Sequence, residues 1–161
     1  MLSVSQRDLM VISCLRRNAR ETLTAMSKKT RIPVSTLFDR IRHFEQGLIR
    51  KHAAIVDFAR LGYSTRANII LKVNKKDRDA VRDYLVRNSF VNCAYKINNG
   101  YDFMAEVIFR NMAELEDFLG TLEDKFKVVD KHVYYVIDDI KKEEFLASPQ
   151  LSQVLCAVQP A

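Results

Sequence analysis

The order of elements predicted over residues 65–137 constrains the fold of this chain more than any other feature. Runs rich in aliphatic and β-branched residues predict strands, at 65–73, 91–98, 102–109 and 128–137. Apolar residues at helical spacing predict two helices between them, at 77–87 and 111–125. Strand, helix, strand, strand, helix, strand is the order of a ferredoxin-like βαββαβ fold. We therefore predict a four-stranded sheet in this part of the chain.

Each of the two predicted helices has one apolar face, which we expect to lie against the same face of that sheet. The side chains predicted to point inward are Ala80, Val81 and Leu85 in the first helix, and Met112 or Ala113, Leu115, Phe118, Leu119 and Leu122 in the second. The opposite face of the sheet then has no covering helix. Because a bare apolar face in a small domain usually marks an interface, we expect a partner there, most simply a second copy.

The first thirty residues predict two short helices. Ser5 followed three residues later by Asp8 is a capping-box-like start for a helix that ends near Asn18. The second helix has Thr22 or Thr24 at its N-terminal cap. A tight turn follows, and together these elements form the first part of a helix-turn-helix pattern.

A third helix over residues 33–44 completes this pattern. Arg31 in the preceding turn stands where a glycine is common, and Pro33 is tolerated in the first turn because the N–H that proline lacks would be unpaired there. The predicted inward face consists of Val34, Leu37, Ile41 and Phe44. The predicted outward face consists of Ser35, Thr36, Asp39, Arg42 and His43, with Arg40 at its edge. These groups suit base edges and phosphates in a major groove, although an ordinary solvated face fits the same pattern.

The positive charge of the chain is concentrated in its first third. The chain contains 26 Lys and Arg against 20 Asp and Glu, a net charge of +6. Residues 1–60 contain 12 basic and 5 acidic side chains, a balance of +7, and residues 61–161 contain 14 and 15, a balance of −1. This split predicts a polyanionic partner for the N-terminal part, because phosphate neutralisation supplies most non-specific affinity for nucleic acid. A basic surface that serves only solubility is the alternative.

The connecting segments give weaker signals. Residues 49–56 fit either a basic strand, as in a wing, or a linker. Residues 138–146 resemble a short helix, and the last residues show no clear periodicity. The predicted division is 1–56 for a winged helix-turn-helix domain, 57–64 for a hinge, 65–146 for a ferredoxin-like domain and 147–161 for a tail.

Composition argues against several other classes of protein. No apolar run approaches the roughly 18 residues that cross a membrane, and the N-terminus lacks a signal-peptide core, so we expect a cytoplasmic protein without a membrane partner. Cys14, Cys93 and Cys156 form no CxxC pair and the His residues are scattered, so we expect no disulfide framework and no metal site. No phosphate-binding glycine motif or catalytic spacing is present, so we expect no cofactor and no catalytic residue.

The sequence resembles the Lrp/AsnC (leucine-responsive, feast/famine) family of transcription regulators over residues 3–145. The motifs that carry the resemblance are Ser5-Gln6-Arg7-Asp8-Leu9, the stretch from Ile32 to Ile41, Glu45-Gln46-Gly47-Leu48-Ile49, Asp57 with Leu61-Gly62, and Gly100-Tyr101-Asp102. The resemblance implies an α+β fold, with an N-terminal winged helix-turn-helix that binds DNA and a C-terminal ferredoxin-like (RAM-type) domain. It further implies sheet-to-sheet homodimers that assemble to tetramers or octamers.

The residue patterns and the resemblance together predict a DNA-binding transcription regulator that responds to a small effector. The predicted base-reading residues are Ser35, Thr36, Asp39, Arg40, Arg42 and His43, with Arg40 or Arg42 on a guanine. The predicted phosphate-binding residues are Arg7, Lys28, Lys29, Arg31, Arg50 and Lys51. The resemblance implies an effector, often an amino acid, near the loop of Asn98, Asn99, Gly100, Tyr101 and Asp102. There Asp102 can accept an ammonium group, or it serves only to cap a hairpin turn.

Two other functions are compatible with the same elements. Siroheme decarboxylases resemble these regulators in fold and would need a cationic, His-containing tetrapyrrole pocket in the C-terminal half. That half has a balance of −1 and one histidine, His132, which counts against this function. The second alternative is an amino-acid-sensing scaffold whose N-terminal helices bind protein instead of DNA, and the uneven charge counts against it.

Overall fold

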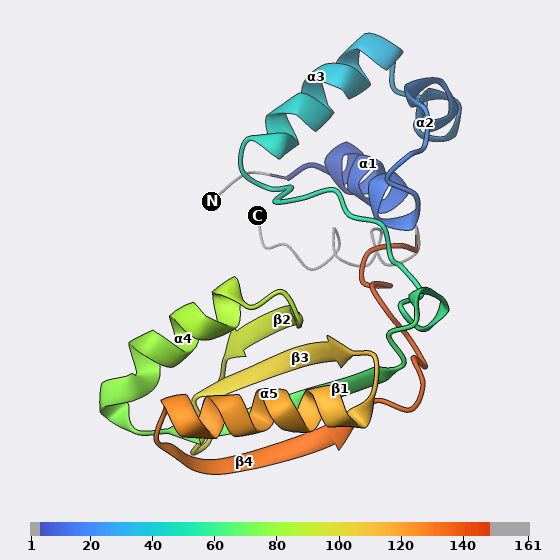
Figure 1. Cartoon of the computed structure of the whole chain (residues 1–161). Coiled ribbons are helices and arrows are strands. Elements are labelled where there is room, and N and C mark those ends of the chain that lie inside the picture. The colour runs from blue at the N-terminus through green and yellow to red at the C-terminus, as the bar shows by residue number, and fades with distance from the viewer. Residues whose placement is uncertain (1–3, 149–161) are drawn as a thin grey trace. The chain divides into compact units, whose positions relative to one another are not determined.

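The computed structural model describes residues 4–148, and the chain forms two compact units (Figure 1). Among the described residues, the first unit contains 4–55 and 140–148, and the second is Val56–Asp139. No helix within residues 4–148 combines the length and the apolar character needed to cross a membrane.

The first unit is built from three helices, α1 (Gln6–Arg17), α2 (Leu23–Thr30) and α3 (Val34–Glu45) (Figure 1). Their buried side chains form one small core, which contains Val11, Cys14, Met26, Ile32, Leu37 and Phe44. This arrangement confirms the predicted helix-turn-helix. Val34, which was predicted to point inward, is 43% exposed, because it lies at the edge of the apolar stripe in the first turn of α3.

Side-chain caps begin the first two helices. The Ser5 hydroxyl accepts from the Asp8 N–H at 3.2 Å, and the Asp8 carboxylate accepts from the Ser5 N–H at 2.9 Å, so the capping box is complete. Thr22, of the two predicted candidates, caps α2, because its hydroxyl accepts from the Ala25 N–H at 3.2 Å. Both caps satisfy N–H groups that have no partner within the helix.

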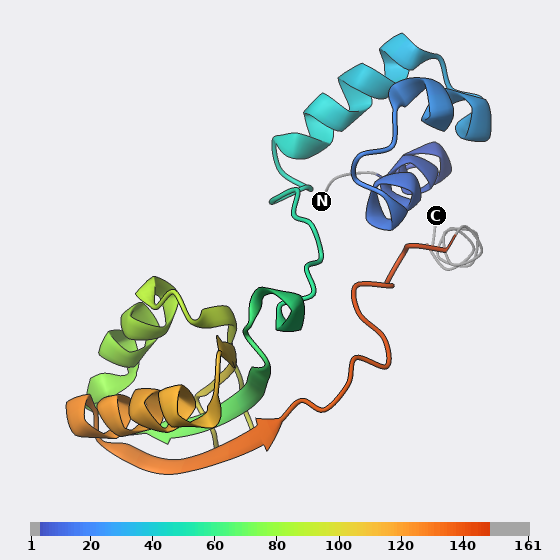
Figure 2. The same ribbon diagram turned by 45° about the vertical axis from the view of Figure 1, so that its right-hand side comes forward.

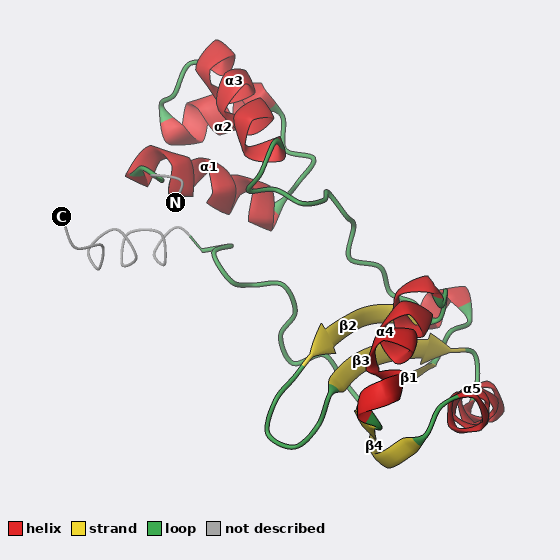
Figure 3. Cartoon of the chain, turned by 90° about the vertical axis from the view of Figure 1, so that its left-hand side faces the viewer, coloured by secondary structure: helices red, strands yellow, loops and turns green. Residues whose placement is uncertain are grey.

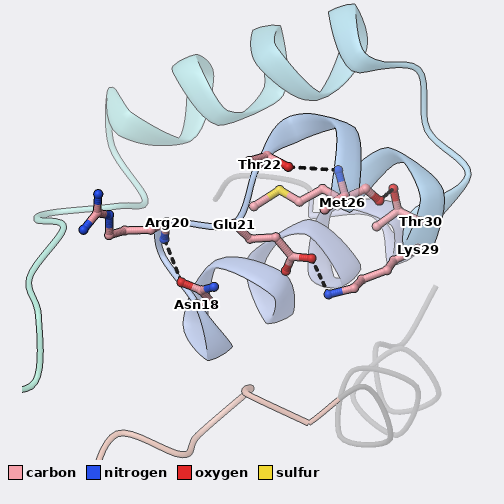
Figure 4. Close-up of polar contacts among 8 residues, drawn as sticks. Asn18, Arg20, Glu21, Thr22, Met26, Lys29 and Thr30 are labelled. Atoms are coloured by element: carbon pink, nitrogen blue, oxygen red, sulfur yellow. Dashed lines mark hydrogen bonds and ion pairs between the residues drawn. The ribbon is translucent and has the colours of Figure 1, made fainter.

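Arg31 ends α2 in the left-handed backbone conformation, with φ 56° and ψ 30°. Its N–H donates to the Ser27 carbonyl at 2.9 Å. One residue earlier, the buried Thr30 hydroxyl donates to the Met26 carbonyl at 2.8 Å (Figure 4). The turn therefore has the geometry of a glycine position, in which another residue costs about 1–2 kcal/mol.

We expect Arg31→Gly to be more stable than Arg31→Ala by about 1 kcal/mol in free energy of unfolding. Both substitutions remove the same charge, so their difference isolates the cost of a Cβ atom in the left-handed conformation. Urea unfolding of both variants measures it. Equal stabilities would show that the turn relaxes without cost.

Residues 49–57 form neither helix nor strand. The wing strand predicted as one alternative for residues 49–56 is therefore absent, and the segment is a linker. A strand needs a hydrogen-bonded neighbour, and within residues 4–148 all strands belong to the sheet of the second unit (Figure 3). The following hinge contains one short 3₁₀ turn, η1 (Ala59–Leu61), which ends at Gly62 with φ 87°.

The short helix predicted over residues 138–146 is also absent, and this prediction was wrong. Glu143 and Leu146 have φ of 54° and 63°, a left-handed conformation that interrupts a helix. The Arg16 side chain on α1 donates to the Glu143 carbonyl at 2.8 Å and to the Phe145 carbonyl at 3.0 Å. These bonds hold the segment in the first unit, whereas the sequence placed it at the end of the second domain. Of the predicted tail, residues 149–161 lie outside the described residues.

The second unit is a four-stranded antiparallel sheet in the order β2-β3-β1-β4 (Figures 1 and 3). Its strands are β1 (Thr65–Val73), β2 (Val91–Lys96), β3 (Phe103–Phe109) and β4 (Val128–Tyr135). Its helices are η2 (Lys75–Asp77), α4 (Arg78–Arg87) and α5 (Met112–Lys125). The predicted ferredoxin-like βαββαβ fold is confirmed.

Both α4 and α5 lie on one face of the sheet (Figure 2). Alternate residues of β1 and β3, such as Ile69 and Val107, pack there against the helices. The helical residues of this core are Val81, Leu85, Leu115, Phe118, Leu119 and Leu122. Ala80, Met112 and Ala113 were predicted to point inward but are exposed, because they lie beside these stripes.

The face without helices is less apolar than the sequence suggested. On this face, Arg66 Nε on β1 lies 3.5 Å from Glu106 Oε1 on β3, and the two side chains are only 18% and 17% exposed. Arg66 also donates to Asp139 at 2.8 Å. Ile70 and Met104 beside this pair are partly buried. A partner on this face would therefore have to satisfy charged as well as apolar groups.

Candidate nucleic-acid interface and effector loop

The outward face of α3 carries the residues predicted to read bases. Ser35, Asp39, Arg42 and His43 are exposed, whereas Thr36 and Arg40 are partly covered. Ser35, Asp39 and Arg42 follow one another at helical spacing and point away from the core. Within residues 4–148, no carboxylate lies within ion-pair distance of Arg42. The Arg42 guanidinium is therefore available to a ligand.

Arg40 makes an ion pair within the first unit. Its guanidinium pairs with the Asp8 carboxylate, and the two side chains are 32% and 13% exposed. The same carboxylate caps α1 through Ser5, so one group holds the start of α1 and joins α1 to α3. Of the two arginines considered for guanine, Arg42 is the one whose guanidinium has no ion-pair partner within residues 4–148.

The contact between α1 and α3 depends on pH through the protonation state of the Asp8 carboxyl. Burial acts to raise the pKa of Asp8, but the hydrogen bonds from Ser5 and the charge and hydrogen bond of Arg40 outweigh it and lower the pKa below its ordinary value. A carboxyl with a lowered pKa in the folded state stabilises the protein above its unfolded pKa of about 3.9, and this contribution is lost as the pH falls through the folded value.

We expect the protein to lose stability below about pH 4, and the Asp8→Asn variant to lose less over the same interval. At neutral pH, Asp8→Asn should be less stable than wild type by about 1 kcal/mol, because it loses the charge that pairs with Arg40 and weakens the cap. Urea unfolding at about pH 7 and pH 3 measures both effects, with Asp39→Asn on the exposed face of α3 as the control. An identical pH dependence in Asp8→Asn and wild type would contradict this assignment.

The residues predicted to bind phosphates lie at the surface of the first unit. One of them, Lys29, pairs with Glu21 (Figure 4). The others are exposed and have no ion-pair partner in the described part of the chain: Arg7, Lys28, Arg31, Arg50 and Lys51. Exposed cations of this kind position a protein on the DNA backbone without reading its sequence.

An open cavity of about 380 Å³ lies beside α3 in the first unit. Its lining residues are Val4, Asp8, Thr36, Asp39, Arg40, His43, Phe44 and Leu48. The structure thus brings four of the six predicted base-reading residues together around this cavity. The other two, Ser35 and Arg42, lie outside it.

The hairpin between β2 and β3 has the backbone that its Asn-Asn-Gly sequence predicts. Asn99 and Gly100 have φ of 62° and 90°, the left-handed values that a tight hairpin turn requires. The side chain of Asn99 is exposed, as is that of Asn98. Four of the five predicted effector residues are therefore at least partly accessible: Asn98, Asn99, Gly100 and Tyr101.

Asp102, the fifth, is 9% exposed and fully engaged. One carboxylate oxygen accepts from the Val73 N–H at 2.9 Å, and the other lies 2.7 Å from Arg78 Nη2. Its own N–H donates to the Leu71 carbonyl at 2.8 Å. These bonds join the hairpin to the end of β1 and the start of α4. They favour the capping role of Asp102 over direct contact with an ammonium group.

Tyr101 joins a polar cluster on β4. Its hydroxyl donates to the Asp130 carboxylate at 2.9 Å and lies 2.6 Å from His132 Nε2. The hydrogen bond to Asp130 is the main reason that the pKa of Tyr101 is raised above its ordinary value. Sequence reasoning missed Asp130 and His132, because their contact with Tyr101 depends on strand pairing. The one available signal was their spacing of two residues on a predicted strand, which places both side chains on the same face. Within residues 4–148 no group of three His, Cys, Asp or Glu is arranged to hold a metal ion.

Comparison with known proteins identifies the family. The model of the Lrp/AsnC ligand binding domain matches residues 66–145. The HTH-type transcriptional regulator FL11 of Pyrococcus abyssi is 30% identical over 142 residues, which is 88% of this chain and 94% of FL11. The chain belongs to the Lrp/AsnC family. The resemblance seen in its sequence motifs is thereby confirmed.

Solved structures of similar proteins share the fold of this Lrp/AsnC chain. A transcriptional regulator of Neisseria meningitidis, solved in complex with L-Met, superposes with a TM-score of 0.81 at 20% identity and covers 87% of this chain and 94% of its own. LrpC of Bacillus subtilis superposes with a TM-score of 0.79 at 18% identity and covers 88% and 99%. The likenesses confirm the α+β layout of a helix-turn-helix followed by a ferredoxin-like domain.

Proposed function

We propose that this Lrp/AsnC protein is a DNA-binding transcription regulator that reads its operator with α3. The observation that carries the proposal is the exposed face of α3, where Arg42 has free donors. This helix lies in the N-terminal part of the chain, residues 1–60, which has a charge balance of +7. Its relatives support the proposal, because FL11 of Pyrococcus abyssi is an HTH-type transcriptional regulator.

In this proposal α3 lies in the major groove. Arg42 donates to O6 and N7 of a guanine, and Ser35 and Asp39 face neighbouring base edges. The Arg40–Asp8 pair holds α3 against α1 and so fixes the angle at which α3 enters. The phosphate-binding residues are Arg7, Lys28, Lys29, Arg31, Arg50 and Lys51. A homodimer paired through the bare sheet face would present two copies of α3 to half-sites of a pseudo-palindrome.

Salt dependence tests the DNA-binding step. We expect the affinity of the full chain for duplex DNA to fall by at least a hundredfold between about 50 and 200 mM salt, as several phosphate contacts release counterions. Fluorescence anisotropy with a labelled duplex measures the slope. A nearly flat dependence would contradict DNA binding and favour the protein-binding scaffold.

We also propose that a small effector, an amino acid, binds near the hairpin loop of Asn98, Asn99, Gly100 and Tyr101 and alters DNA binding or assembly, with Asp102 holding the loop in place. The match of residues 66–145 to a ligand binding domain supports this proposal, as does the L-Met bound to the Neisseria regulator. A ligand that binds only the folded state raises the melting temperature. A thermal-shift screen of the standard amino acids tests the proposal, with Asn99→Ala to locate the site. A screen without any shift would contradict it.

A further inference from the structure

Phe38 is the largest apolar side chain exposed on helices α1 to α3. It is 54% exposed, and Val34, one helical turn earlier, is 43% exposed. No aromatic ring within residues 4–148 packs against Phe38. The core of the first unit does not use it, because Leu37 and Phe44 supply the buried side chains of α3. An exposed aromatic ring offers a large apolar surface to a partner.

The position of Phe38 on α3 indicates which partner. Phe38 lies three residues after Ser35 and four before Arg42, so all three side chains point to the same side of the helix. It also lies in the first half of α3, and residues near the N-terminus of a recognition helix are among those that contact base edges. The apolar side chain is therefore within the surface that the proposed function assigns to the major groove.

The major groove offers one apolar group to such a side chain, the C5 methyl of thymine. Arginine and serine side chains recognise hydrogen-bonding groups and gain little binding energy from a methyl group. A phenyl ring gains binding energy, because contact with the ring removes the methyl group from water. We propose that Phe38 contacts a thymine methyl group in the operator and sets the preference for thymine at one position, beside the base read by Arg42. This inference rests on the proposed DNA-binding function.

Deoxyuridine substitution tests the inference, because it removes the methyl group and keeps every hydrogen-bonding atom of the base. Each thymine of an operator selected by the full chain is replaced in turn. Wild type should lose about fourfold in affinity at one position, the value expected for one buried methyl group. Phe38→Ala should bind the thymine and uracil duplexes equally at that position. Phe38→Leu, which keeps an apolar side chain, should retain most of the discrimination.

Val86→Ala is the matched control, because Val86 is an apolar side chain of the second unit that is 73% exposed. This variant should discriminate thymine from uracil as wild type does. Phe38 is outside the core, so its variants should melt like wild type, and a circular-dichroism melt checks this.

The outcomes separate this inference from the function on which it rests. Specific operator binding with the same thymine-to-uracil ratio in Phe38→Ala and wild type would overturn the role of Phe38 alone. Failure of wild type to select any operator would overturn both. Loss of self-association in Phe38→Ala, with thymine discrimination unchanged, would assign the ring to an interface between copies and also overturn the inference.

Discussion

Replacing Asp102 with Ala is expected to lower the free energy of unfolding by about 1–4 kcal/mol. The substitution leaves the Val73 N–H buried without its acceptor, at a cost of about 1–3 kcal/mol. It also removes the ion pair with the half-exposed Arg78, which contributes up to about 1 kcal/mol. Because the hairpin is joined to β1 and α4 through this one carboxylate, the loss should appear in global unfolding by urea.

Asp130→Ala is the control for this prediction, since it removes an acidic side chain that is 48% exposed in the same unit. We expect it to change the free energy of unfolding by less than about 1 kcal/mol. A different result for Asp102→Ala would give Asp102 another role. If Asp102→Ala unfolds like wild type but no longer responds to an amino acid that stabilises wild type, the carboxylate is a direct ligand group.

Replacing Arg42 with Ala is expected to weaken operator binding by about ten- to a hundredfold, or about 1–3 kcal/mol. The preference for guanine should relax at one position, because the bidentate contact that distinguishes this base is lost. Stability should not change, since Arg42 is exposed and has no ion-pair partner among the described residues. Competition binding against single-base operator variants measures the effect.

Lys28→Ala provides the comparison for Arg42. A phosphate contact should weaken binding by a similar factor on every sequence and reduce the salt slope by about 1. If Arg42→Ala behaves in this way, Arg42 contacts phosphate and the base must be read by another side chain of α3.

The parts of the fold that follow from local periodicity were predictable. The bounds of β1, Thr65–Val73, are those predicted, because a run of aliphatic residues between turn signals admits few alternatives. The order of the elements then determined the ferredoxin-like sheet. The capping box of Ser5 and Asp8 followed from two residues three positions apart.

The parts that depend on distant pairing were not predictable. Arg40 and Asp8 are 32 positions apart, so their ion pair could not be predicted. Arg40 and Arg42 are two arginines of the same predicted helix, and the pattern alone assigns both of these arginines to DNA. Tyr101 and His132 are 31 positions apart and meet only through strand pairing. The helix expected over residues 138–146 is replaced by turns. The side chain of Arg16, more than 120 positions away, donates hydrogen bonds to carbonyl groups of these turns.

Phe38 shows a different limit of sequence reasoning. The wheel of α3 places it between the polar and apolar faces, and an apolar residue at such a boundary is most simply assigned to the core. Its exposure of 54% became clear only once Leu37 and Phe44 were seen to fill that core.

The most direct test of the central claim is selection of bound duplexes from a random pool by the full chain at about 150 mM salt. We predict the recovery of a pseudo-palindrome whose half-sites are about one helical turn, or a multiple of it, apart. Each half-site should contain a guanine whose selection is lost in Arg42→Ala. Recovery of no preferred sequence, with or without the standard amino acids, would contradict the claim that this protein is a sequence-specific regulator.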